Sequence, residues 1–105
     1  MKRLLIAALA ALPIMAHAKQ IEVPKNCREV YFTAQAIMEL RQMGMDMPVL
    51  VEITAHHKGL QSIAIEAYAE RRYLSAAYRE RAARDFAEDF YNVCYEMHGT
   101  KEFGK

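Results

Sequence analysis

The sequence predicts an all-α fold, a compact four-helix domain in which one disulfide joins the first and last helices. Three observations support this prediction. Apolar residues recur at the spacing of an α-helix along most of the chain. Four glycines and three prolines in 105 residues disfavour a β-fold with many turns. The two cysteines, Cys27 and Cys94, lie near the two ends of the predicted helical domain, residues 27–98.

The start of the chain is typical of a secretory signal peptide, which we assign to residues 1–18. Lys2 and Arg3 give it a positive start, a largely apolar run follows, and Ala-His-Ala at residues 16–18 fits a cleavage site. The apolar run is too short to cross a bilayer, which needs about 20 residues. We therefore expect a periplasmic or secreted protein, with no stable membrane insertion after the signal is cleaved.

The first helix has recognisable signals at both of its ends. Residues 19–26 mix polar residues with Pro24 and predict an extended lead-in. Asn26 is a favourable N-cap, and Glu29 stands where a capping-box acid is found. Helical spacing predicts a helix over residues 27–43, and Gly44 is a suitable C-terminal stop.

The second segment is open to two interpretations. Asp46 and Pro48 can begin a helix, because proline is tolerated in a first turn. The following run, residues 49–54, is rich in β-branched residues and is compatible with a strand. We favour a short helix to about His57, because the chain offers no partner strand.

Two further helices are predicted in the second half of the chain. Lys58-Gly59 is expected to interrupt the helical pattern, and a third helix follows from Leu60 to near Arg71. Ser75 is expected to cap the last and longest helix, and residues 99–105 form a polar tail. The apolar stripe of the last helix is Tyr78, Ala82, Phe86, Phe90, Val93 and Met97.

The cysteines constrain the number of helices. An even count in an exported chain indicates a disulfide, with two free thiols or a shared metal as the alternatives. Cys27 begins the first helix, and Cys94 lies near the end of the last. In an antiparallel up-and-down arrangement these ends meet only when the helix count is even. Four helices satisfy that condition.

Charge and residue types exclude several classes of function. Removal of Lys2 and Arg3 with the signal peptide leaves 12 of the 14 basic residues against 13 acidic ones. That balance argues against a nucleic-acid partner, which requires a basic surface. No nucleophile with a partnered base and no metal-binding histidine spacing is present, so we expect no catalysis and no cofactor. His56 and His57 are interpreted as a polar end of the second helix, near its last carbonyls.

Three methionines surround the predicted turn after the first helix. Met43, Met45 and Met47 alternate along the chain, and soft thioether sulfur suits copper(I). The alternative is that these flexible side chains fill gaps between the first two helices.

A second candidate site is a cluster of arginine and tyrosine, residue types that are enriched where proteins bind proteins. The alternative is solvated pairing with neighbouring acids on the same helix. Tyr91 and Tyr95 are interpreted as core and rim positions. The residues of the candidate protein-binding face are Arg71, Arg72, Tyr73 and Arg81.

A scattered set of residues suggests a family. These residues are Ala36-Ile37-Met38, Arg41-Gln42, Gly44, Met47-Pro48, Ala67-Tyr68, Arg72-Tyr73, Phe86, Asp89 and Cys94-Tyr95. In them the chain resembles an uncharacterised group of small exported helical proteins of bacteriophages and prophages, with a signal peptide and one end-to-end disulfide. The resemblance implies an exported setting, with no activity and no site residues to carry over.

These observations predict a non-catalytic exported protein that binds and modulates another envelope or periplasmic protein, such as a phage-encoded inhibitor in exclusion or lysis control. In size and plan the chain is similar to phage periplasmic proteins that block the lysozyme of a superinfecting phage. It is also similar to acid-activated periplasmic chaperones, so an acid-stress chaperone is the first alternative. In acid its carboxylates protonate while its basic residues stay charged, and self-repulsion loosens the domain. A methionine-rich copper(I)-binding protein is the second alternative.

Overall fold

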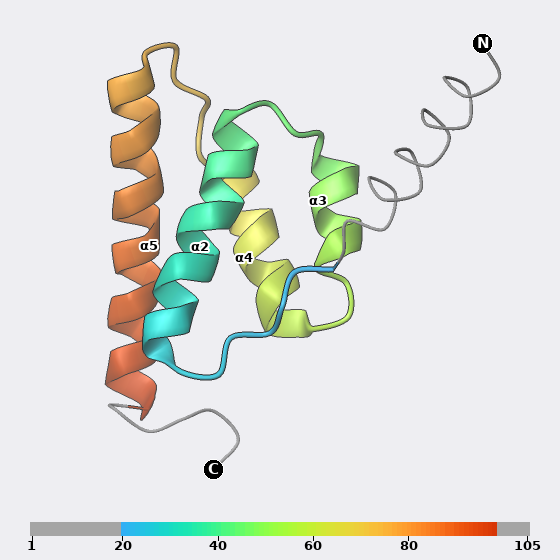
Figure 1. The fold of residues 1–105 in the computed structure, drawn as a ribbon, viewed down its shortest axis with the longest axis vertical. Coiled ribbons are helices and arrows are strands. Elements are labelled where there is room, and N and C mark those ends of the chain that lie inside the picture. Colours follow the sequence, from blue (N-terminus) through green and yellow to red (C-terminus); the bar gives the residue numbers. More distant parts are fainter. Residues whose placement is uncertain (1–19, 99–105) are drawn as a thin grey trace, which may run out of the picture.

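The computed structural model describes residues 20–98, which form four helices. In chain order these helices are α2 (Cys27–Gln42), α3 (Met47–Ile53), α4 (Lys58–Ala69) and α5 (Ala76–His98). The long helices α2 and α5 run antiparallel side by side, and α4 packs against both α2 and α3 (Figure 1). The predicted all-α domain of four helices is therefore confirmed. The predicted signal peptide and polar tail, residues 1–18 and 99–105, lie outside the described residues.

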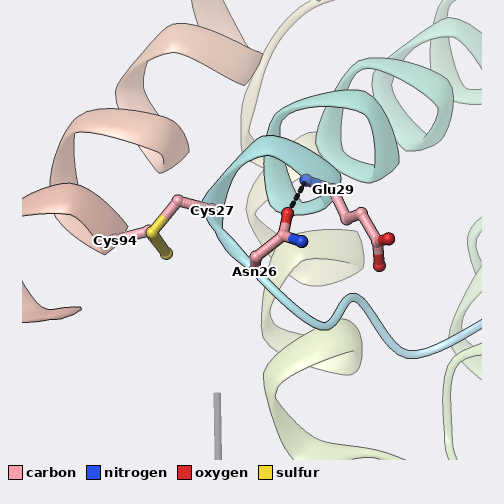
Figure 2. The surroundings of a disulfide bond; sticks show 4 residues. All are labelled: Asn26, Cys27, Glu29 and Cys94. Atoms are coloured by element: carbon pink, nitrogen blue, oxygen red, sulfur yellow. Dashed lines mark hydrogen bonds between the residues drawn. A yellow bond between two sulfur atoms is a disulfide. The ribbon is translucent and has the colours of Figure 1, made fainter. Parts of the chain in front are cut away.

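Helix α2 begins and ends within one residue of the predicted positions. The side chain of Asn26 accepts a hydrogen bond of 2.9 Å from the backbone N–H of Glu29 (Figure 2). The Glu29 carboxylate in turn accepts a hydrogen bond of 2.8 Å from the backbone N–H of Lys25. At the other end Gly44 has a φ of +100°, a left-handed conformation that glycine adopts without strain.

Helix α3 decides between the two interpretations of the second segment, because the β-branched run is helical. It ends at Ile53, however, and the prediction that it continues to about His57 was wrong. The carbonyl oxygen of Ile53 accepts a hydrogen bond of 3.1 Å from the backbone N–H of Ile21 in the lead-in. The hydroxyl of Thr54 donates to the carbonyl of Leu50 at 2.8 Å. The Ile53 carbonyl, which would accept from the N–H of His57 in a longer helix, is therefore occupied by the lead-in.

Helix α4 begins two residues earlier than predicted. Lys58-Gly59 does not interrupt a helix but forms the first turn of α4. His57 is the N-cap, and its Nδ1 atom accepts a hydrogen bond of 3.3 Å from the backbone N–H of Leu60. The Nε2 atom of His56 lies 2.8 Å from the carbonyl oxygen of Ile21. The placement of both histidines near the last carbonyls of the second helix was therefore wrong.

The core lies where α2 meets α4 and α5. Small side chains of α5, Ala83 and Ala87, are fully buried and let that helix approach α2 closely. The predicted stripe of α5 holds at Phe86 and Phe90, which pack against the core. The residues at both ends of the predicted stripe are not buried, because α5 packs mainly along α2 and its buried face is narrow. The exposed members of that stripe are Tyr78, Val93 and Met97.

Among the described residues, no helix combines the length and the apolar character needed to cross a bilayer.

Candidate protein-binding surfaces

The predicted disulfide joins the start of α2 to the last part of α5. Cys27 and Cys94 are bonded, with their Cα atoms 5.6 Å apart, and both side chains are buried (Figure 2). The bond spans 67 positions of the sequence and fixes the two helices at one end of the pair. This end is called the disulfide end.

Four aromatic rings form a continuous row across α2 and α5 near the disulfide end. The ring centroids of Tyr31 and Phe32 lie 5.2 Å apart in an edge-to-face arrangement. Tyr31 meets Tyr91 of α5 at 6.4 Å, and Tyr91 meets Tyr95 at 6.1 Å. We call these four residues the aromatic surface.

The two outer rings of the aromatic surface are open to solvent. Phe32 is 53% exposed and Tyr95 is 50% exposed, whereas the inner tyrosines are half-buried. The guanidinium of Arg28 lies 5.8 Å from the ring centroid of Phe32. A hollow of about 480 Å³ lies here, lined by Arg28, Tyr31, Phe32, Glu88, Tyr91 and Asn92.

A sequence signal for this surface existed. Tyr31 follows Cys27 by one helical turn, and Tyr91 and Tyr95 flank Cys94. In an antiparallel pair closed by the disulfide, Tyr31 and Tyr91 each lie about one turn from a cysteine and face one another across the two helices, and Tyr95 extends the row along α5. The interpretation of Tyr91 and Tyr95 as core and rim treated each helix alone and missed the row that they complete.

The structure divides the predicted arginine–tyrosine face. The Nε atom of Arg72 donates to the carbonyl oxygen of Gln42 at 3.4 Å, so this arginine helps to close the end of α2. The guanidinium of Arg71 lies 5.2 Å from the ring centroid of Tyr73. Among residues 20–98 neither Arg71 nor Arg81 forms an ion pair. The intrahelical pairing that was the alternative is seen between Glu80 and Arg84 of α5, at 4.0 Å.

The remaining members of the face, Tyr73 and Arg81, line a second hollow of about 330 Å³. The ring of Tyr78 lies 6.2 Å from that of Tyr73. The Tyr73 hydroxyl donates to the Glu70 carboxylate at 3.0 Å, and this hydrogen bond raises the pKa of Tyr73. We call it the Tyr73 hollow, and its lining is Glu70, Tyr73, Tyr78, Arg81, Ala82, Asp85, Phe86 and Asp89.

A buried glutamine fixes the chain segment that carries Tyr73. Gln42 is almost fully buried at the end of α2. Its Nε2 atom donates to the carbonyl oxygen of Arg71 at 2.8 Å, and its Oε1 atom accepts from the backbone N–H of Tyr73 at 2.9 Å. The guanidinium of Arg41 donates to the carbonyl oxygen of Glu70 at 3.0 and 3.3 Å. These contacts define the polar end of the α2–α5 pair, opposite the disulfide end.

Tyr68 adds a further contact near the polar end. Its hydroxyl donates to the carbonyl oxygen of Met45, and the Arg41 guanidinium lies 4.8 Å from its ring centroid. Burial raises the pKa of Tyr68, the charge of Arg41 opposes that rise, and Asp46 adds to it. The neutral phenol is therefore the form that this site favours.

The three candidate methionines lie in and beside the connection between α2 and α3. Met45 packs against the core, which agrees with a gap-filling role, while Met43 and Met47 are exposed. Within residues 20–98, no group of three or more histidine, cysteine, aspartate or glutamate side chains is placed to hold a metal ion. Copper binding by the methionines stays a prediction.

Three comparisons set the chain against known proteins. No protein-family model, no curated protein and no solved structure matches it. The resemblance to exported proteins of phages and prophages therefore stays a prediction, and the two surfaces described above are the observations from which a function can be proposed.

Proposed function

We propose that this chain is a small exported, non-catalytic protein that binds another protein of the cell envelope and modulates it, as a phage-encoded inhibitor does in exclusion or lysis control. The aromatic surface is the observation that carries the proposal. Tyrosine, phenylalanine and arginine are enriched at protein–protein interfaces, and buried aromatic side chains supply much of the binding energy there.

The aromatic surface is ordered before any partner arrives. Each outer ring rests on an inner one, Phe32 on Tyr31 and Tyr95 on Tyr91. An aromatic side chain that is already held loses little conformational entropy on binding, which favours affinity. The disulfide lies one helical turn away and fixes the distance between the two helices that supply the rings.

The disulfide also supports the exported setting. Such bonds form and persist in oxidising compartments such as the bacterial periplasm, and they are rare in the cytosol. A small domain has limited core burial, so a covalent link is a large share of its stability.

Affinity capture with the oxidised protein from a native envelope extract tests the proposal. We expect one dominant partner. With that partner purified, the double substitution F32A/Y95A should weaken binding at least tenfold, because loss of an interface hot spot costs about 2 kcal/mol or more. V49A/I65A is the matched control, because these apolar side chains are similarly exposed, at 46% and 48%, on α3 and α4.

Two results would contradict the proposal in different ways. If a partner is captured and F32A/Y95A binds it with unchanged affinity, the interface does not include the aromatic surface. Recovery of the protein as a free monomer in every extract, with no crosslinked partner, would remove the binding role itself.

A further inference from the structure

We infer that the Tyr73 hollow binds an arginine side chain of a partner protein. The hollow is separate from the aromatic surface. A test that fails at one of these sites therefore does not contradict the other. The hollow combines three aromatic rings with an excess of carboxylates, which come from the end of α4, the following connection and α5.

The aromatic walls suit a planar cation. The rings of Tyr73 and Tyr78 lie 6.2 Å apart and are tilted by 34°, and the partly buried Phe86 also lines the hollow. A guanidinium group stacks on tyrosine faces through cation–π attraction. Its flat shape distinguishes it from the compact ammonium group of lysine.

The charged groups of the lining favour the same ligand. Three carboxylates, Glu70, Asp85 and Asp89, stand against one basic group, Arg81. Asp85 and Asp89 are four residues apart on α5 and therefore share one face of that helix. Among residues 20–98, no basic nitrogen lies within 4.0 Å of either aspartate carboxylate. Arginine binds carboxylates through paired hydrogen bonds, so these two aspartates complement it in charge and in geometry.

The other arginines nearby do not fill the hollow. Arg79 donates to the carbonyl oxygens of Tyr73 and Leu74, at 3.2 and 2.7 Å. Arg71 stacks on the Tyr73 ring but is not part of the lining. The lining therefore keeps its excess of negative charge even though arginines surround it.

The hollow is also held in shape by the core. Gln42 binds the backbone on both sides of residue 72, through the carbonyl oxygen of Arg71 and the N–H of Tyr73. Because Gln42 is almost fully buried, the segment that carries the Tyr73 ring is anchored to the interior. An anchored ring needs little reordering when a ligand enters.

The probe for this site is a blocked Gly-Arg-Gly tripeptide, titrated into the purified oxidised protein and followed by amide chemical shifts. We expect saturable shifts at Tyr73, Tyr78, Asp85 and Asp89. The uncharged analogue Gly-citrulline-Gly should cause none, because it keeps the shape of arginine and lacks its charge. Gly-Lys-Gly should bind at least threefold more weakly than the arginine peptide.

Charge-neutral variants locate the site. D85N/D89N should weaken binding of the arginine peptide at least tenfold, and its amide spectrum reports whether the fold is intact. E88Q/E96Q is the matched control, since it removes the same charge from exposed positions of α5 outside the hollow, and it should bind within twofold of the parent protein.

Three outcomes would overturn the inference. Equal shifts with the citrulline peptide would show that charge is not recognised. If both double variants weaken binding of the arginine peptide equally, the effect comes from the overall charge of the protein and not from the hollow. Binding of the lysine peptide as tight as that of the arginine peptide would remove the specificity for a guanidinium.

Discussion

The two ends of the α2–α5 pair are held together by different chemistry. At the disulfide end, one covalent bond between Cys27 and Cys94 joins the helices directly. At the polar end, Gln42 and Arg41 of α2 bind the backbone of the segment that leads into α5. A reductant can break the disulfide. The hydrogen bonds at the polar end are insensitive to reductant, but they depend on polar groups that must stay paired away from water.

The difference also affects what each end can present to a partner. The disulfide limits how far the helices separate, so the outer rings, Phe32 and Tyr95, can stay half exposed and still keep their positions. The polar end holds a loop segment, and with it a hollow lined by side chains from the end of α4, the connection and α5. A row of aromatic rings beside one hollow and a second, more acidic hollow thus arise toward different ends of one helix pair.

Removal of the disulfide should have the largest effect. We expect C27S/C94S to lower the free energy of unfolding by about 4 kcal/mol, the chain-entropy estimate for a loop of this length. Guanidinium denaturation of the oxidised, reduced and substituted proteins measures it, and the reduced parent should match the variant.

Hydrogen exchange of the same proteins sharpens the comparison. Protection should fall first around Tyr31 and Tyr91 and last around Gln42. Two results would contradict the view that the two ends are held independently. One is a fall in the free energy of unfolding of less than about 1 kcal/mol, and the other is an equal loss of protection at both ends.

Disruption of the polar end should have an intermediate effect. Q42L keeps the buried volume but leaves the carbonyl of Arg71 and the N–H of Tyr73 without their partner, at a cost of about 2 kcal/mol. Urea denaturation gives this value. Q35L is the control, because Gln35 is a partly buried residue of the same helix whose side chain forms no hydrogen bond within residues 20–98. Equal stability of Q42L and Q35L would show that the network does not hold this end.

The helix caps give the smallest effects, with one cap at each end. N26A removes the acceptor for Glu29 beside the disulfide, and S75A removes the acceptor for Tyr78 at 3.1 Å beside the polar end. Each should cost about 1 kcal/mol. We expect faster amide exchange in the first turn of α5 for S75A, and little change in the first turn of α2 for N26A, because the disulfide still holds it. Fast amide exchange in the first turns of both α2 and α5 would show that the disulfide does not hold the first turn of α2.

Local signals predicted most of the fold. The caps Asn26 and Ser75, the stop at Gly44 and the covalent pairing of the cysteines depend on residue type and spacing, which a sequence displays. The prediction that Lys58-Gly59 ends a helix failed because histidine is not among the preferred N-caps, yet His57 caps α4.

Long-range contacts account for what the sequence did not reveal. Gln42 has the appearance of a surface residue until the segment after α4 folds over it and buries its amide. The arginine–tyrosine cluster predicted a protein-binding face of four residues, but the fold directs Arg72 to the end of α2 and brings Asp85 and Asp89 beside Tyr73. Which charge prevails at a surface depends on the tertiary arrangement, and neighbours in sequence do not determine it.

The bond between Cys27 and Cys94 makes the main chain between them a closed ring. Leu74, in the connection before α5, is 98% exposed and is an obvious position for a protease to cut. A single cut there opens the ring but separates nothing, since both pieces stay tethered through sulfur. Only a reductant acting together with the protease would release them, so a nicked molecule can keep its shape and both of its surfaces.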